Sequence, residues 1–186
     1  MVIGRSIAAW AALSALVGAA PTGGPIDLHG KRIDPFADTA RAKVFLFVRT
    51  DCPISNRYAP ELQRIASEFS SRGVEFWLIY SDPAETAAGI EAQIAQYKLP
   101  GEPLRDVDHK LAARSEATVS PQAAVFNGSG KLIYTGRIDD QFVDFGKARP
   151  RALTHDLESA ITAVLSGKPV KVTKTRAVGC YLADVQ

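Results

Sequence analysis

The sequence predicts one α/β domain built on a mixed β-sheet with helices on both faces. Two continuous apolar runs, 43–49 and 74–80, are typical of buried strands. A helical pattern separates them, so these strands should be parallel with a right-handed crossover. Two shorter apolar runs, 123–126 and 131–134, flank the turn signal NGSG at 127–130, which predicts an antiparallel hairpin.

The helix between the first two strands is expected directly after Cys52. Gly73 should end it, and Pro60 should kink it. Its apolar residues recur at helical spacing: Tyr58, Leu62, Ile65 and Phe69.

Three further helices complete the predicted order. Asp82, followed by a proline and then by Glu85, has the pattern of a helix start. A short helix is expected over 109–116. Thr154 is expected to cap a final helix that ends before Gly167.

The composition is that of an ordinary globular domain. The chain has 186 residues, of which 46% are hydrophobic and 23% charged. The net charge is only +2 and both signs are mixed along the chain, which argues against a nucleic-acid-binding surface. We expect a linker at 20–25, a single domain at 26–167 and a C-terminal tail at 168–186.

Residues 1–19 have the layout of a secretory signal peptide. Arg5 is the only charged side chain before Asp27, and the apolar stretch 7–20 contains small residues suited to cleavage. This stretch is short for a membrane span, which needs about 20 residues. A buried N-terminal helix and an uncleaved anchor are the alternatives. A cleaved signal places the protein in the periplasm or outside the cell, where thiols can form disulfides.

The chain has two cysteines, Cys52 and Cys180. Cys52 lies between a predicted strand and a predicted helix. The free N–H groups and partial positive charge of a helix start stabilise a thiolate there. Arg49 and Arg57 are close enough in sequence to add to this effect. The alternative is a buried and inert cysteine.

Two segments of the sequence resemble thioredoxin-like proteins. Residues 47–62 (FVRTDCPISNRYAPEL) are similar to the active-site segment of redoxins, the alkyl hydroperoxide reductase/thiol-specific antioxidant group, and of exported thiol–disulfide reductases. Residues 118–126 (TVSPQAAVF) resemble the segment that carries the cis-proline in these proteins. The resemblance covers residues 26–166 and implies a thioredoxin-like fold with a central mixed sheet.

The resemblance also implies roles for individual residues. Cys52 is expected to be the attacking nucleophile, and Pro121 is expected to be cis and to lie against it. Ser120 is expected to bind an extended substrate strand through its backbone. Thr50 and Pro53 are expected to line the same substrate site.

Three residues depart from the family pattern. Ser55 stands where a dithiol member has its second cysteine, and serine cannot resolve a mixed disulfide. Leu46 stands where many thioredoxins have a buried acid. Arg49 stands three residues before the cysteine, where a one-site peroxidase has a threonine. These departures argue against peroxidase chemistry and against exchange through a local dithiol.

Cys180 is the candidate for the missing resolving residue. Several redoxins resolve with a distant cysteine, and we expect Cys180 to reach Cys52 on a movable tail. A static Cys52–Cys180 disulfide is one alternative, and the chain-entropy model credits it with about 5 kcal/mol. The other alternative is a remote Cys180 and a Cys52 that acts as a monothiol.

An acidic and aromatic segment follows the predicted hairpin. Asp139, Asp140 and Asp144 are expected in a solvated loop that lies over the site, with no metal bound. The three histidines are scattered, and there is no Cys-x-x-x-Cys pattern to support a copper site.

The sequence therefore predicts an exported thiol–disulfide oxidoreductase of the redoxin type with antioxidant activity. No organic cofactor is expected, because electrons would come from another thiol. Its partner would be a thiol or disulfide protein, or a small thiol or peroxide, with no nucleic acid and with a membrane only if the signal is uncleaved. A thioredoxin-fold binding module or copper chaperone, and a thiol peroxidase, are the alternative functions.

Overall fold

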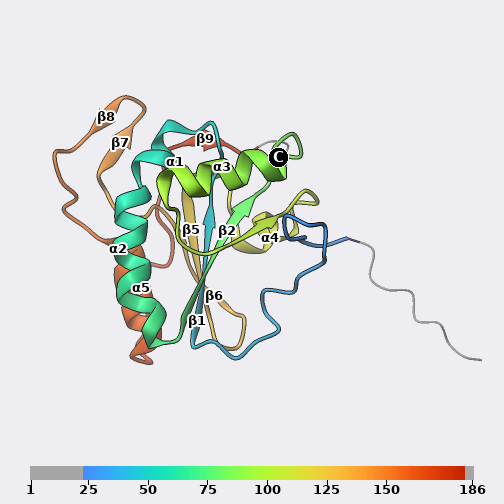
Figure 1. Ribbon diagram of the computed structural model, residues 1–186. Coiled ribbons are helices and arrows are strands. Elements are labelled where there is room, and N and C mark those ends of the chain that lie inside the picture. The colour runs from blue at the N-terminus through green and yellow to red at the C-terminus, as the bar shows by residue number, and fades with distance from the viewer. Residues whose placement is uncertain (1–22, 183–186) are drawn as a thin grey trace, which may run out of the picture.

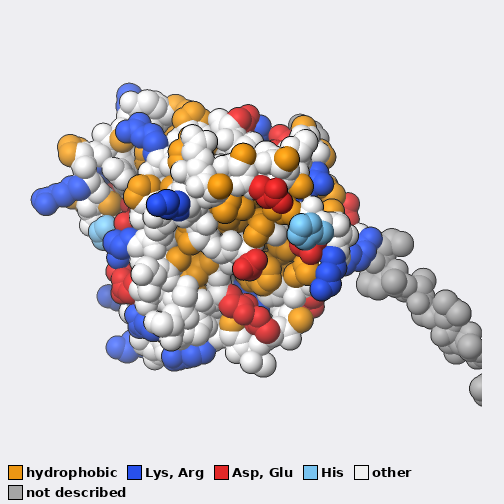
Figure 2. Space-filling view, in the orientation of Figure 1, with side chains coloured by type: hydrophobic (Ala, Val, Ile, Leu, Met, Phe, Trp, Pro, Cys, Tyr) orange, Lys and Arg blue, Asp and Glu red, His pale blue; other side chains and the backbone are white. Residues whose placement is uncertain are grey.

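A computed structural model describes residues 23–182, so the predicted signal peptide at 1–19 lies outside the described residues. No helix in the described part of the chain is long and apolar enough to cross a membrane. Both signs of charge occur on the face seen in Figure 2, with apolar atoms visible between them.

The core of the fold is a mixed five-stranded sheet (Figure 1). Its strands are β1 (Ala42–Phe47), β2 (Val74–Tyr80), β3 (Glu102–Arg105), β5 (Gln122–Asn127) and β6 (Leu132–Gly136). Their spatial order is β3-β2-β1-β5-β6. β1 is parallel to β2 and antiparallel to β5, as the sequence predicts. The edge strand β3 was not expected, because its short EPLR sequence has no clear strand pattern.

Helices cover both faces of this sheet. They are α1 (Pro53–Arg57), α2 (Ala59–Phe69), α3 (Ala87–Tyr97), α4 (Lys110–Ser115) and α5 (Asp156–Leu165), and a 3-10 turn, η1 (Ser70–Arg72), follows α2. α2 and α5 lie side by side, and Arg64 of α2 pairs with Glu158 of α5. The apolar faces of α2, α3 and α5 join one core cluster, whereas α4 joins a second cluster on the opposite face.

β1 shows why the sheet needs two layers of helices. Val44 and Leu46 belong to the first cluster, and Phe45 and Phe47 belong to the second. All four side chains are buried because successive residues of a strand point to opposite faces. The continuous apolar run of this strand therefore reflects burial on both sides.

The helix after Cys52 is broken rather than kinked. α1 ends at Arg57 and α2 begins at Ala59, with Tyr58 between them. Pro60 falls in the first turn of α2, where a missing N–H costs nothing. The left-handed Gly73 ends the following 3-10 turn, as expected.

Two predicted helix starts are wrong. α3 begins at Ala87, and its cap is Thr86, whose hydroxyl accepts the N–H of Gly89 at 3.1 Å. Asp82 instead forms a turn ahead of the helix, where it accepts the N–H of Ala84. The last helix begins at Asp156 and not after a Thr154 cap, because the hydroxyl of Thr154 donates to the Asp156 side chain.

Two small two-stranded sheets lie beside the central one. β7 (Phe142–Asp144) and β8 (Lys147–Ala148) form a hairpin that projects from the body (Figure 1, upper left). β4 (Val119–Ser120) pairs with β9 (Cys180–Tyr181), so the C-terminal tail is attached to the domain next to Pro121.

Candidate active site

Cys52 lies at the turn between β1 and α1. It is the N-cap residue of α1, with an extended backbone conformation, and Pro53 begins the helix. Its N–H donates to the carbonyl of Arg49 at 3.3 Å, and its carbonyl accepts from Asn56. These bonds fix the backbone that carries the sulfur at the end of the central strand.

Ser120 and Pro121 lie directly against this sulfur. The Ser120–Pro121 peptide bond is cis, as the family resemblance implies. In its thiol form, Cys52 donates to the Ser120 carbonyl, with 3.0 Å between Sγ and O. The hydroxyl groups of Ser55 and Ser120 are 2.7 Å apart. Ser55, where a dithiol member has cysteine, therefore ties α1 to the cis-proline segment.

The tail brings Cys180 to the same place. In the antiparallel pairing of β4 with β9, Cys180 is the partner of Ser120. The Leu182 N–H donates to the Thr118 carbonyl at 3.0 Å, and Leu182 is buried in the second core cluster. The expected movable tail is thus docked in the structure, and it lies where we expected an extended substrate strand.

Gly179 makes this close approach feasible. A Cβ atom at this position would lie 2.0 Å from the Ser120 carbonyl oxygen and 3.0 Å from the nitrogen of Pro121. Real Cβ atoms essentially never lie as close to a backbone atom as the 2.0 Å to the Ser120 oxygen. Only glycine at this position lets the tail pass the cis-proline segment.

The two cysteines are free thiols with opposite pKa shifts. Burial acts to raise the pKa of Cys52, but hydrogen bonds from the Cys180 side chain and from Ser55 outweigh it, and the pKa is lowered. Burial, the hydrogen bond with Cys52 and the Cys52 charge raise the pKa of Cys180 to about 11. The arrangement therefore favours a thiolate on Cys52 and a protonated Cys180.

Access to the two sulfurs also differs. Cys52 is completely buried, whereas Cys180 is partly exposed. A cavity of about 340 Å³ lies beside the tail and is lined by Val119, Gly179 and Tyr181, among others. With the tail docked, Cys180 is therefore the more accessible of the two cysteines.

Glu85, which the sequence suggested only as part of a helix start, holds the backbone of Thr50, two residues before Cys52. The Thr50 N–H donates to a carboxylate oxygen of Glu85 at 2.6 Å, and Glu85 is nine-tenths buried. The second Glu85 oxygen is buried without a hydrogen-bond partner. Burial raises the pKa of Glu85, against the lowering effect of the Thr50 hydrogen bonds and of Arg49. The backbone of Thr50 is thus hydrogen-bonded to Glu85. Pro53, the other residue expected to line the substrate site, is exposed beside Cys52.

The segment after β6 is folded onto the domain, so the expected solvated loop is wrong for two of its acids. Asp139 and Asp140 are buried, and only Asp144 is exposed. The Tyr58 hydroxyl donates to Asp139 at 2.6 Å, and Asp140 accepts the N–H groups of Leu153 and Thr154.

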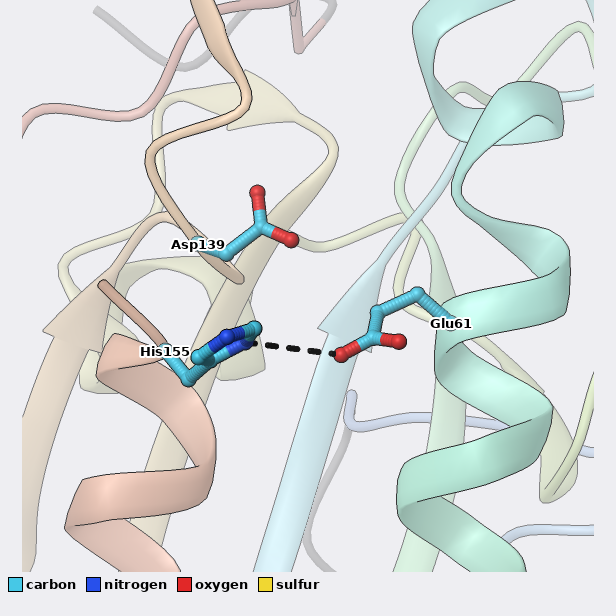
Figure 3. A group of neighbouring side chains, drawn as sticks. All are labelled: Glu61, Asp139 and His155. Atoms are coloured by element: carbon cyan, nitrogen blue, oxygen red, sulfur yellow. Dashed lines mark ion pairs between the residues drawn. The ribbon is translucent and has the colours of Figure 1, made fainter. Parts of the chain in front are cut away.

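One group of possible metal ligands occurs within residues 23–182. Glu61 of α2, Asp139 and His155 each offer an atom within 4.8 Å of the others, and Figure 3 shows them facing one another. Arg64 already holds both oxygens of Glu61, and Tyr58 holds Asp139. The group is best explained as a brace between α2, the segment after β6 and the start of α5, and it includes neither cysteine.

The sulfur pair, the cis-proline and the sheet order define a thioredoxin-like redoxin. The model of the AhpC/TSA family matches residues 22–135, and the chain belongs to this family. The match includes Cys52 and Pro121 but ends before the tail that carries Cys180. The sequence has no significant match among curated proteins.

Solved structures share the fold at low sequence identity. An uncharacterized conserved protein from Geobacillus kaustophilus is 23% identical, with a TM-score of 0.74 and coverage of 88% of both chains. A hypothetical protein from Sinorhizobium meliloti 1021 is 24% identical, with a TM-score of 0.69 and coverage of 89% of this chain and 95% of the other. A secreted Mycobacterium tuberculosis disulfide oxidoreductase homologous to E. coli DsbE is 21% identical, with a TM-score of 0.53 and coverage of 74% and 92%.

Proposed function

We propose that the protein is a thiol–disulfide oxidoreductase in which Cys52 attacks and Cys180 resolves. The observation that carries this proposal is the meeting of both cysteines at Ser120. Cys52 donates to its carbonyl, and Cys180 is its partner across the β4–β9 ladder. The lowered pKa of Cys52 favours it as the nucleophile, and the raised pKa of Cys180 keeps that thiol protonated until it is needed.

The reaction has two exchange steps. The Cys52 thiolate attacks one sulfur of a substrate disulfide, which forms a mixed disulfide and releases one substrate thiolate. Cys180 then gives up its proton and attacks Sγ of Cys52. The second substrate thiol leaves with a proton, and a Cys52–Cys180 disulfide remains. The substrate gains two electrons, and a dithiol partner later returns two electrons to the cysteine pair.

The first step requires the tail to move. Cys52 has no exposed surface while β9 is paired with β4, so a substrate disulfide reaches it only when this two-residue pairing opens. Rebinding of the tail then brings Cys180 to the mixed disulfide. Export through the predicted signal peptide would place this chemistry outside the cytoplasm, where such a disulfide persists.

To test this proposal, the reduced protein is mixed with a small aromatic disulfide and the reaction is quenched at set times. The released aromatic thiol and the intact mass of the protein are then measured. The wild-type protein should release two thiols and lose two hydrogens. Cys180→Ser should stop after one thiol, with the other half of the reagent bound to Cys52. Cys52→Ser should react at least about tenfold more slowly, because this variant lacks the thiol whose pKa is lowered, and burial still raises the pKa of the remaining Cys180. Rapid reaction of Cys52→Ser would contradict the assignment of the nucleophile.

A further inference from the structure

Arg49 joins the turn that carries Cys52 to the tail that carries Cys180. Its side chain is 19% exposed. Nη1 donates to the carbonyl of Tyr181, the residue after Cys180, at 3.0 Å. This bond connects the turn that carries Cys52 directly to β9, in addition to the hydrogen bond between Cys180 and Cys52.

Two carboxylates fix the orientation of the guanidinium group. Nε and Nη2 donate to the two oxygens of Asp51, both at 3.0 Å. Asp82, from the loop after β2, lies 3.3 Å from Nη2. A planar guanidinium held in this way has little freedom left, so its remaining nitrogen is aimed at the tail.

The backbone of Arg49 is held as well. Its carbonyl accepts the side-chain amide of Gln93 at 2.9 Å and the N–H of Cys52 at 3.3 Å. Both the backbone and the guanidinium group of Arg49 are therefore held by other residues of the domain. The β9 strand that it reaches has only two residues.

We propose that Arg49 is a positioning residue that clamps the tail so that Cys180 stays opposite Cys52. The proposal rests on the proposed function and gives a role to the residue that replaces the peroxidase threonine. The charge of Arg49 also acts to lower the pKa of Cys180, which favours the thiolate that the resolving step needs. Removing the clamp should lower the effective concentration of Cys180 at Cys52, while both cysteines remain in place.

The test compares Arg49→Met and Arg49→Lys with Arg151→Met, an exposed matched control. Each variant is equilibrated with reduced and oxidised glutathione, and the Cys52–Cys180 disulfide is measured by mass after alkylation. Loss of a charge-assisted hydrogen bond predicts an effective concentration about tenfold lower for Arg49→Met. Arg49→Lys should recover part of this loss, and Arg151→Met should match the wild-type protein.

A second readout does not depend on the redox chemistry. The Leu182 N–H that binds Thr118 should exchange with solvent faster in reduced Arg49→Met than in the wild-type protein. An unchanged disulfide equilibrium and unchanged Leu182 exchange would overturn the clamp while leaving the cysteine pair intact. If Leu182 exchange rises but even the wild-type protein forms no disulfide, the clamp on the tail stands and the proposed function fails.

Discussion

Cys180 is the β-ladder partner of Ser120, whose carbonyl accepts the thiol of Cys52. Ser120 therefore contacts both the proposed nucleophile, in the first half of the chain, and the Cys180 thiol near its end. The tail lies in the position that a substrate strand would need. We infer that docking of the tail and binding of an extended substrate exclude each other.

Gly179→Ala should undock the tail. The added Cβ would lie 2.0 Å from the Ser120 carbonyl oxygen, and neither backbone can yield without breaking the β4–β9 pairing. We expect the Cys52–Cys180 disulfide to form at least about tenfold less readily in glutathione buffers, with the sheet still folded. Alkylation of Cys52 by iodoacetamide should become faster.

Gly89→Ala in α3 is the matched control for this prediction. Its Cβ would meet only the Thr86 hydroxyl, at 3.2 Å. An undisturbed disulfide equilibrium in Gly179→Ala would show that the tail does not need its close approach to Ser120.

Tyr58→Phe should destabilise the fold by about 1–3 kcal/mol, because it leaves the buried Asp139 without one of its donors. The Tyr58 hydroxyl donates to Asp139 at 2.6 Å, and the Gln141 N–H is the remaining partner. Urea unfolding measures the loss. Tyr97→Phe is the control, since no polar contact of the Tyr97 hydroxyl is seen in the described part of the chain. If Tyr58→Phe lowers the free energy of unfolding by less than about 0.5 kcal/mol, the prediction is wrong, because a change that small is typical of exposed surface residues.

Glu85→Gln should change how stability depends on pH. Burial raises the pKa of Glu85 above its usual 4.5, so the folded protein binds this proton more tightly than the unfolded chain does. The contribution of Glu85 to stability is therefore fully present below pH 4.5 and is lost as the pH rises through the folded-state pKa. Relative to Glu85→Gln, the wild-type protein should lose stability over this window.

Urea unfolding at a series of pH values tests this prediction, with the exposed Glu91→Gln as the control. If the wild-type protein gains stability over Glu85→Gln as the pH rises, the Thr50 hydrogen bonds outweigh burial and the pKa shift has the opposite sign.

The central strands and the position of Cys52 follow from local patterns in the sequence. The apolar run of β1 is buried on both faces, and Cys52 lies at its end, where the change to a helix was predicted. The cis-proline was expected from a short resemblance around Pro121, and the structure confirms it. Each of these features depends on a few neighbouring residues.

The wrong helix start at Asp82 has a tertiary cause. Asp82 pairs with Arg49, and Glu85 accepts the N–H of Thr50. Both acids therefore bind the turn just before Cys52. A helix that began at Asp82 would place them elsewhere. The capping pattern in the sequence is real, but partners far along the chain override it.

Long-range pairing also explains what the sequence did not predict at the tail and after β6. Two-residue strands such as β4 and β9 have no periodicity to detect. The charge of Asp139 suggested a solvated loop. Asp139 is nevertheless buried, because it accepts a hydrogen bond from the hydroxyl of Tyr58, which lies far away in the sequence between α1 and α2. A close approach such as that of Gly179 is visible only once both segments are placed.

The reduction potential of the cysteine pair tests the central claim most directly. The protein is equilibrated in graded thiol–disulfide buffers, alkylated, and analysed by intact mass and peptide mapping. We predict one transition that joins Cys52 to Cys180, at about −120 to −270 mV, the range of catalytic pairs. A transition below about −300 mV would mark a structural bond, and two free thiols in every buffer would contradict the redox pair.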